Sequence, residues 1–531
     1  MSELATNPPH TPTPMSRAQI FDVSVLEDSH SRLREPVGND VLADLRLDHV
    51  LASLSDNGRD ELVVELFTCP PEDLDTVEYR QEVAADLRDP SVRSAVATFR
   101  RGMDGIDERV LSATKASSSD DYHWQQRRRL VEAMAAYTTL VRDLRSWLGD
   151  VGLHSRGMSK VREYLEGYAT SPAFMDLAQS TAAVIDSLDR VQFHILMTTG
   201  QILVTPAVEE GSYTDQMVTL FERFQDGQEN AATGKRVSDP GISHVTAQIV
   251  AQVARMEPEP FQALENHCRR FADFQDATLV RFVLESGFYL SYLALIAPIE
   301  DAGLVFSRPR IVLHGKHLQA LESFDLALAG QLVTQGEHVV TNDACLDGPE
   351  RVLVITGPNQ GGKTTYARMI GQLHHFASIG LPVPGHDVEL PLVDTVLTHF
   401  EREEGRGDPT GKLEEELVRL RGLLEIATPR SLLVLNEAFT STSLQDAREL
   451  GERVLEKIIA ADMLAVYVTF VDELSRLGPA TVSLVGQTAE KEPDRRTFKV
   501  SRQLADGDAR ALAIAGRNGL TYAQLLERIP S

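Results

Sequence analysis

One glycine-rich segment carries side chains whose types and spacing suit phosphate binding. Gly357, Gly362, Lys363 and Thr364 fit the pattern G-x-x-x-x-G-K-[ST]. In such a loop the glycines let backbone N–H groups close around a di- or triphosphate, and the N-terminus of the next helix adds positive potential. The lysine ammonium can reach the β- and γ-phosphates, and the threonine hydroxyl can join a Mg²⁺ shell. The sequence therefore predicts a nucleotide phosphate site.

The flanking residues decide between a phosphate loop and a chance match in a glycine-rich turn. Residues 352–355 are an apolar run that predicts a buried strand, and helical sequence opens at Lys363. A strand before and a helix after are the context that the motif requires. We therefore assign the phosphates to one continuous set of residues: Gly357, Pro358, Asn359, Gln360, Gly361, Gly362, Lys363, Thr364 and Thr365.

A second predicted strand ends in groups that suit hydrolysis. Residues 431–437, SLLVLNE, are an apolar run with Asn436 and Glu437 at its tip. A carboxylate at a strand tip can orient an attacking water or accept its proton. The alternative is a pair of helix N-cap residues. The functional interpretation is favoured because this run matches residues 352–355 in length and character; Asp446 follows in the polar segment STSLQDA.

The elements that must position these groups follow an α/β pattern from about residue 309. Short apolar runs alternate with helical segments and glycine turns, which is typical of a sheet covered by helices on both faces. The predicted strands are 352–355, 396–398, 432–435, 465–469, 481–484 and 497–500.

The preceding residues predict mostly helices. Residues 1–18 are rich in Pro and Thr, which predicts disorder, and helical spacing begins at Asp40. Asp75 or Thr76 is the expected N-cap of a later helix. Other helices are predicted at 61–67, 124–148, 160–188 with a break near 171–172, 213–224 and 245–299 with a break at 258–260. The part 261–299, if unbroken, forms a rigid arm of about 58 Å.

Two polar or alternating segments interrupt this helical region. Residues 193–206 predict a β-hairpin, and 225–243 predict a loop whose bases are Lys235 and Arg236. The triplet 127–129, three arginines, suits either nucleic acid or a solvated helix face paired with acids such as Asp120 and Asp121; the second interpretation is favoured.

Composition limits the class of protein. The chain has 531 residues, which predicts several domains, and a net charge of −26, which argues against a basic nucleic-acid footprint along the whole chain. Cys69, Cys268 and Cys345 lack metal-ligand spacing, which predicts reduced thiols. No signal peptide is evident, and the apolar patch 288–298 is too short to span a bilayer, so a cytoplasmic protein without a membrane is expected.

Taken together, these motifs resemble the MutS family of DNA mismatch repair ATPases, which are relatives of the ABC ATPases. GPNQGGKTT at 357–365 resembles the phosphate loop of that family, VTND at 340–343 the segment beside the nucleotide base, and LVLNEAFTSTSLQDA its Walker B segment with the following turn. Residues 510–529 resemble its C-terminal helices. The resemblance is specific over about 335–531; LRLDHVLASLS, LDTVEYRQEVAADL and YLALIAPIEDAGLVFSRP resemble its helical core and lever.

The resemblance implies a fold and a set of roles. It implies an α/β ABC-type P-loop ATPase domain at 308–531, preceded by a mostly α-helical core/lever domain at 40–307 with a clamp-like insert near 191–243, and a disordered tail at 1–39. ATP and Mg²⁺ are the implied cofactors, with Thr364 and Asn436 on the metal and Glu437 as the catalytic residue. A homodimer through the ATPase domains is implied, with its interface at Asp446, Thr410 and Gly411, the last two within 407–417. Lys235 and Arg236 are the candidates for DNA contact.

Departures from the family pattern refine the expectation. Asn436 stands where the family has aspartate, and Phe470 stands where it has histidine. Residues 407–417 lack the serine–threonine–phenylalanine of the signature loop, and Val339, beside His338, replaces an aromatic contact to adenine. Residues 1–39 are too few for a mismatch-reading domain and hold no Phe-x-Glu wedge. ATP binding with slow turnover is expected, without mismatch recognition by that wedge.

Three functions remain in view. The first is a MutS-like, ATP-driven dimeric switch that acts on DNA in mismatch repair or recombination. The second is an ATP-bound protein-interaction switch with little catalysis and no direct mismatch recognition, which Asn436, Phe470 and the charge of −26 favour. The third, a small-molecule kinase, is disfavoured because no acceptor pocket or lid is evident and the helical arm would have no purpose.

Overall fold

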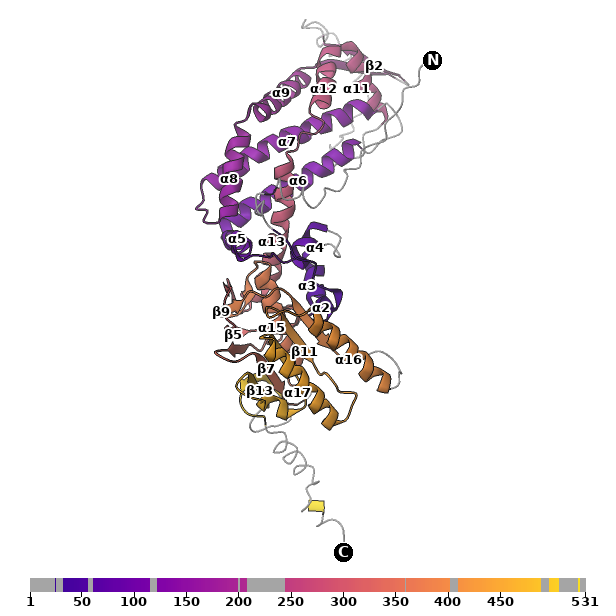
Figure 1. Ribbon diagram of the computed structural model, residues 1–531. Helices are drawn as coiled ribbons and strands as arrows, with labels where there is room; N and C mark the ends of the chain where they lie inside the picture. Colours follow the sequence, from indigo (N-terminus) through magenta and orange to yellow (C-terminus); the bar gives the residue numbers. More distant parts are fainter. Residues whose placement is uncertain are drawn as a thin grey trace, which may run out of the picture. The chain divides into compact units, whose positions relative to one another are not determined.

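The computed structural model describes residues 24, 32–55, 61–114, 122–198, 201–207, 244–358, 360–401, 409–488, 496–505 and 524–525. The chain forms two compact units, and Figure 1 labels their elements. Unit 1 comprises Met1–Arg93, Gly152–Val161 and Leu284–Ser531, and unit 2 comprises Ser94–Val151 and Arg162–Val283. The predicted domain limits stay predictions.

A six-stranded sheet lies at the centre of the C-terminal part of unit 1. Its strand order is β10-β11-β12-β7-β13-β14, and neighbours are parallel except for the antiparallel pair β13–β14. All six strands were predicted, with shifted ends. They are β7 (Val352–Thr356), β10 (Val396–Phe400), β11 (Leu432–Asn436), β12 (Leu464–Val468), β13 (Thr481–Thr488) and β14 (Arg496–Arg502).

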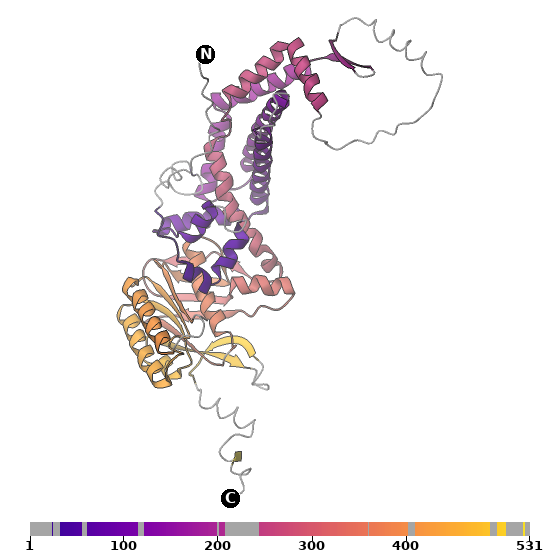
Figure 2. The ribbon, with the colours of Figure 1, turned by 90° about the vertical axis from the view of Figure 1, so that its right-hand side faces the viewer.

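Helices bury the central strands of this sheet. Every residue of β7, β11 and β12 is buried, as parallel strands between helices require. On one face, α16 (Pro409–Ile426) and α17 (Leu444–Ala460) join the apolar core of these strands, and Figure 2 shows the two helices side by side. The helix α15 (Lys363–Ser378) contacts β11 and β12. The predicted α/β pattern is confirmed.

A second, four-stranded sheet was not predicted. Its order is β4-β9-β5-β6, with β4 parallel to β9 and the other pairs antiparallel. Its short strands carry polar residues that disfavour strands in isolation, such as NDACL in β6. Its strands are β4 (Arg310–Val312), β5 (Leu318–Ser323), β6 (Asn342–Leu346) and β9 (His386–Pro391). A separate two-stranded sheet pairs β3 (Phe306–Ser307) with β8 (Val383–Pro384).

Four short helices near the N-terminus belong to the same unit as the sheet. They are α2 (Asn39–Asp44), α3 (Leu47–Leu54), α4 (Glu61–Thr68) and α5 (Leu74–Asp86). The helical pattern from Asp40 is interrupted at Arg46, whose φ is 55°. The N-cap of α5 is Asp73, which accepts from the Thr76 N–H, and not Asp75 or Thr76 as predicted. On α15, Gln372 Nε2 donates to the Leu45 carbonyl over 2.9 Å, which ties these helices to the sheet layer.

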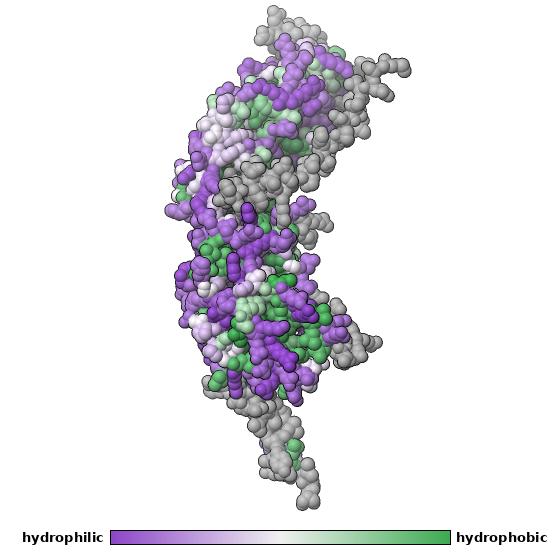
Figure 3. Space-filling view, in the orientation of Figure 1, coloured by the Kyte–Doolittle hydropathy of each residue, from purple (hydrophilic) through white to green (hydrophobic). Residues whose placement is uncertain are grey.

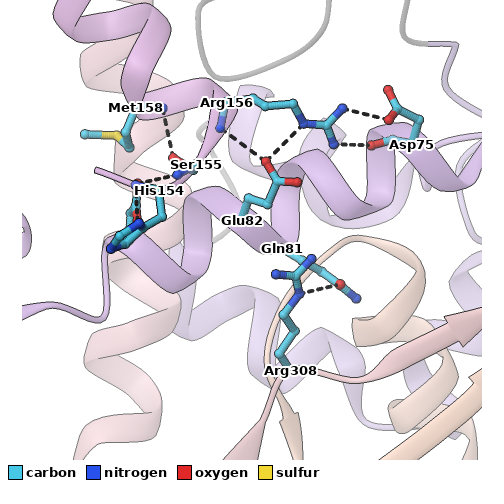
Figure 4. Close-up of polar contacts among 9 residues, drawn as sticks. Asp75, Gln81, Glu82, His154, Ser155, Arg156, Met158 and Arg308 are labelled. Carbon is cyan, nitrogen blue, oxygen red and sulfur yellow. Dashed lines mark hydrogen bonds and ion pairs between the residues drawn. The ribbon is translucent and has the colours of Figure 1, made fainter. Parts of the chain in front are cut away.

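Figure 4 shows how α5 holds two distant parts of the chain. Arg156 donates to Glu82 and Asp75, so the segment Gly152–Val161 is fixed to α5. On the other side, Arg308 Nε donates to Gln81 Oε1 over 3.0 Å, and Gln81 Nε2 donates to the Pro309 carbonyl. The helical N-terminal part and the residues that lead into the sheets therefore form one unit.

Unit 2 is built from helices and one hairpin. The hairpin of β1 (Phe193–Thr198) and β2 (Gln201–Pro206) confirms the prediction for 193–206. The helix predicted at 213–224 and the loop with Lys235 and Arg236 lie outside the described residues. The helices that contribute to this unit are α6 (Pro90–Thr114), α7 (His123–Gly149), α8 (Arg156–Ala169), α9 (Pro172–Asp189), α11 (His244–Met256), α12 (Pro258–Arg270) and α13 (Ala277–Asp301).

The prediction of one rigid helical arm at 261–299 is wrong, because two separate helices, α12 and α13, occupy these residues. α12 ends at Arg270, and α13 begins after Asp276, whose carboxylate caps Leu279 and accepts from the Tyr164 hydroxyl over 2.8 Å. The second helix then continues past Pro298 to Asp301. Two arginines of the triplet pair with acids, as favoured: Arg127 contacts Glu265, and Arg128 contacts Glu132 and Asp189. The acids named in the prediction, Asp120 and Asp121, lie outside the described residues.

One described helix, α13, is long and apolar enough to cross a membrane by length and composition alone. The apolar stretch is therefore longer than the predicted patch 288–298. However, 61% of its most apolar window is buried inside the protein, where Phe288, Tyr292 and Ile296 belong to the core. This is the behaviour of a core helix.

Candidate nucleotide site

The loop between β7 and α15 needs glycine at defined positions. Gly357 has φ of 123° and Gly362 has φ of 88°, which side chains rarely adopt. A Cβ at Gly357 would lie 3.0 Å from the Gly486 nitrogen, and one at Gly361 would lie 2.9 Å from the Pro358 carbonyl oxygen. The backbone is thus packed too closely for side chains, as a phosphate cradle requires. Asn359 lies outside the described residues.

Lys363, the first residue of α15, points back over this loop. Its side chain is buried, and Nζ donates to the carbonyls of Gly357 over 3.0 Å and Pro358 over 3.4 Å. The same nitrogen lies 3.7 Å from Oε1 of Glu437. The two charged groups that the sequence assigned to different motifs therefore meet at one point.

The tip of β11 brings Asn436 and Glu437 to the carboxyl edge of the sheet. Asn436 is buried, and its Oδ1 has no hydrogen-bond partner among the described residues. A buried amide oxygen without a partner is rare and suits a missing donor, a water or a hard cation. Glu437 has φ of 56°, and its N–H donates to the Val468 carbonyl over 2.9 Å, so its backbone is fixed against β12.

A cavity of about 420 Å³ lies against Lys363 and Glu437, while Gly357, Pro358 and Asn436 are not among its lining residues. Gln360, Gly361, Gly362, Lys363, Thr364, Thr365 and Glu437 line one part of it. The remainder is largely apolar, with Phe324, Leu328, Leu332, Val339, Val340 and Phe498 beside Asp325, Glu337, His338 and Asn342. A lining that combines a lysine and loop backbone with apolar side chains and an aromatic ring suits a nucleotide, which has charged phosphates and an aromatic base.

Phe498 and α14 (Leu326–Gln335) are parts of this site that sequence reasoning missed. Phe498 lies on β14 with φ of 57° and is half exposed. Asn342, from the predicted VTND segment, accepts from the Val500 N–H over 2.7 Å and donates to the Phe498 carbonyl over 3.2 Å. The position of the ring thus depends on a contact between residues distant in sequence, which leaves no local signal.

Asp325 at the start of α14 is structural. Its carboxylate accepts from the Leu328 N–H and from Gln372 Nε2, which caps the helix. Burial raises the pKa of Asp325. The carboxylate anchors the apolar wall of the cavity to α15 and does not serve as a free acid.

Other predicted residues do not line this cavity. Asp446 lies exposed in the first turn of α17, where it accepts from the Ser443 hydroxyl over 2.8 Å. Thr410 and Gly411 lie in the first turn of α16, and Phe470 is exposed two residues after the end of β12. The same helix α16 exposes Val418 and Ile426, and Figure 3 shows apolar surface among polar residues where α16 lies in Figure 1. Lys235 and Arg236 lie outside the described residues.

Comparisons with known proteins agree with the motifs. Residues 353–523 match the family model described as MutS domain V. The DNA mismatch repair protein MutS of Thermotoga petrophila is 25% identical over 307 residues, which are 56% of this chain and 37% of that protein. The MutS proteins of Shouchella clausii and Thermosipho melanesiensis are 31% and 36% identical over 197 and 142 residues, which are 35% and 26% of this chain and 22% and 17% of theirs.

The chain thus spans between 17% and 37% of the length of these curated relatives. The matched residues 353–523 include the loop, the strand tip and part of the cavity lining. Residues 353–523 thus carry domain V of the MutS family, a P-loop ATPase domain.

Proposed function

We propose that this protein is a MutS-like ATP-driven switch that acts on DNA in mismatch repair or recombination and hydrolyses ATP slowly. The observation that carries the proposal is the meeting of Lys363 and Glu437, 3.7 Å apart, in the lining of a nucleotide-sized cavity. A phosphate-binding lysine and a water-positioning carboxylate at one point are what nucleotide hydrolysis requires.

The residues present fit ATP and Mg²⁺. The glycine cradle of 357–362 leaves no space for a Cβ at Gly357 or Gly361, and the apolar wall suits a base. Thr364 and Asn436 would hold the metal, because the Oδ1 of Asn436 is buried without a partner among the described residues. When bound, Mg²⁺ supplies charge neutralisation at the phosphates.

Slow turnover follows from the groups at the strand tips. Glu437 would orient the attacking water, while its neighbour Asn436 offers a neutral amide where a carboxylate would bind metal more strongly. Phe470 has no ionisable group that could sense the γ-phosphate. Lys363 must also exchange its bonds to two loop carbonyls for bonds to phosphate.

We further propose an ABC-type arrangement in which two chains dimerise through the ATPase domains and move helical levers. The exposed apolar side chains Val418 and Ile426 support an interface along α16, whose first turn carries Thr410 and Gly411, and Asp446 lies exposed at the start of α17. DNA is the proposed target because the relatives are named DNA mismatch repair proteins; Lys235 and Arg236 are the proposed contacts.

The assignment is tested by nucleotide affinity and hydrolysis in the parent protein, Lys363→Ala and Glu437→Gln. We expect Lys363→Ala to weaken ATP affinity at least tenfold, and Glu437→Gln to bind ATP normally but to lose most hydrolysis. Lys457→Ala, at an exposed position of α17, is the matched control and should behave like the parent. The assignment is refuted if the parent protein binds no ATP, or if the parent, Lys363→Ala and Glu437→Gln hydrolyse ATP at the same rate.

The second candidate, a protein-interaction switch without DNA, is favoured by the net charge of −26. The two candidates separate in a titration against duplex, mismatched, branched and single-stranded DNA, with and without ATP, at two salt concentrations. Affinity that falls steeply with salt supports DNA contact, because phosphate contacts release counterions. ATP-dependent dimerisation without salt-sensitive DNA binding supports the alternative.

A further inference from the structure

Glu416, in the second turn of α16, lies between two strand ends of the ATPase sheet. Its Oε1 accepts from the Phe439 N–H over 2.9 Å and is 3.1 Å from His399 Nε2. Phe439 follows β11 directly after Glu437 and Ala438, and His399 is the penultimate residue of β10. One carboxylate oxygen of α16 is thus bonded to the turn that carries the proposed catalytic residue.

His399 and Arg419 hold this carboxylate in place. Arg419 Nε donates to His399 Nδ1 over 3.0 Å, and an Arg419 terminal nitrogen donates to the Phe400 carbonyl over 2.7 Å. Because Nδ1 accepts a hydrogen bond from Arg419, the ring proton is on Nε2, which donates a hydrogen bond to Glu416. The His399 side chain is only 2% exposed, and that of Glu416 is 16% exposed, so water competes little for these bonds.

The turn itself depends on external support. Glu437 and Phe439 have φ of 56° and 65°, so both adopt the left-handed region that L-residues disfavour. Phe439 is fully buried, and a buried N–H needs an acceptor. The Val468 carbonyl fixes the Glu437 N–H from β12, and Glu416 fixes the Phe439 N–H from α16.

We propose that Glu416 is a positioning residue for hydrolysis, which sets the conformation of the Glu437 turn through the Phe439 N–H. This inference rests on the proposed role of Glu437. Glu416 itself has no path to a phosphate, because it does not line the nucleotide cavity. Because α16 begins at Pro409, beside the proposed interface residues Thr410 and Gly411, a shift of this helix on dimerisation reaches Glu437 through one hydrogen bond.

The first readout needs no nucleotide. Amide hydrogen exchange in the unliganded protein reports on the Phe439 N–H through peptides that cover 437–441. Glu416→Ala removes the acceptor and should raise exchange of these peptides at least tenfold, while peptides of β12 stay as in the parent. Glu416→Gln keeps an acceptor oxygen of the same reach and should remain near the parent. Glu425→Ala, an exposed residue near the other end of α16 whose partner is Arg421, is the matched control.

The second readout separates positioning from general damage. Glu416→Ala should lower kcat at least tenfold while ATP affinity stays within twofold, and Glu416→Gln should restore kcat to within threefold of the parent. In single-turnover measurements, the double variant Glu416→Ala with Glu437→Gln should hydrolyse ATP nearly as fast as Glu437→Gln alone. The reason is that both changes remove the same contribution to the rate, that of a correctly placed Glu437 carboxylate. Glu416→Asp, which keeps the charge but shortens the reach, serves in place of Glu416→Ala if that variant does not fold, with the same expected loss of kcat.

The outcomes are distinct for the inference and for the function beneath it. If Glu437→Gln lowers hydrolysis but neither Glu416→Ala nor Glu416→Asp changes kcat or exchange, the inference is overturned and the proposed function stands. If the losses in the double variant multiply, Glu416 acts independently of Glu437 and the inference is also overturned. If Glu437→Gln hydrolyses like the parent, the role of Glu437 fails, and the inference fails with it.

Discussion

The ammonium of Lys363 is bonded to the carbonyl oxygens of Gly357 and Pro358 while it lies 3.7 Å from the carboxylate of Glu437. The lysine therefore closes the loop on itself and spans the gap between the end of β7 and the end of β11. A buried lysine among oxygen neighbours is already placed where it can donate hydrogen bonds to phosphate oxygens. This pair sets the geometry from which the following predictions start.

Gly357→Ala should disrupt the loop. The new Cβ would lie 3.0 Å from the backbone nitrogen of Gly486, and φ of 123° is strained for alanine. We expect a loss of roughly 1–3 kcal/mol in the free energy of unfolding and at least tenfold weaker ATP binding, measured by denaturant titration and calorimetry. Gly422→Ala in α16 is the control, because nothing lies within 4 Å of its Cβ and alanine favours helices. Equal behaviour of the two variants would contradict the prediction.

Asn436→Asp should strengthen metal binding and speed hydrolysis. A carboxylate replaces a buried amide oxygen that has no partner among the described residues. Without metal we expect a loss of roughly 1–3 kcal/mol in stability, since a second charge is buried near Glu437. Added Mg²⁺ should recover this loss and raise ATP turnover at least fivefold.

The measurement is the melting temperature as a function of Mg²⁺ concentration, together with steady-state hydrolysis. Asn436→Leu is the control, since it offers no oxygen and should show no Mg²⁺ response beyond that of surface binding. If the parent, Asn436→Asp and Asn436→Leu respond to Mg²⁺ alike, position 436 does not contact the metal.

Acid should destabilise the unit that contains α15. Burial lowers the pKa of His374 to about 4 and that of His375 to about 3, and each Nε2 lacks a hydrogen-bond partner among the described residues. Since both pKa values are below the unfolded value of about 6.5, the stability that the neutral rings contribute is complete above that pH. It decreases as the pH falls toward 4 and then 3, by up to roughly 1.4 kcal/mol per pH unit for each ring.

Urea unfolding at pH 7.5, 6.0 and 5.0 tests this slope. Below about pH 6.5, His374→Leu and His375→Leu should each reduce the slope of the free energy of unfolding against pH by the contribution of one bound proton. His314→Gln, at an exposed position, should leave the slope unchanged. A slope that is identical in the parent and both leucine variants would place the acid sensitivity elsewhere.

The sequence predicts the part of the site that is local. The loop 357–365 and the strand tip at Asn436 and Glu437 were predicted because a buried strand, a glycine turn and a charged group follow one another along the chain. The strand order brings these tips together, since β7 pairs with β12 and β12 pairs with β11. The parallel register thus turns two local motifs into one site.

The remainder depends on contacts between distant residues. Phe498 reaches the cavity because Asn342 fixes β14, and the Glu416 carboxylate meets Phe439 only after α16 has packed on the sheet. The break between α12 and α13 arises because Asp276 is bonded by Tyr164 from another helix, which outweighs the helical pattern of 261–299. Local propensity and residue spacing do not show which distant residues will form these contacts.

The bond from Gln372 to the Leu45 carbonyl joins residues 327 positions apart in the chain. Leu45 is made early and Gln372 late, so at about 5–20 residues per second the ribosome needs on the order of 15–65 s to supply the partner. During that interval the buried faces of α2 and α3, which carry Leu42, Leu47 and Val50, have no finished surface to pack on. A nascent chain that stops before Gln372 therefore leaves the apolar faces of α2 and α3 without this part of their packing partner.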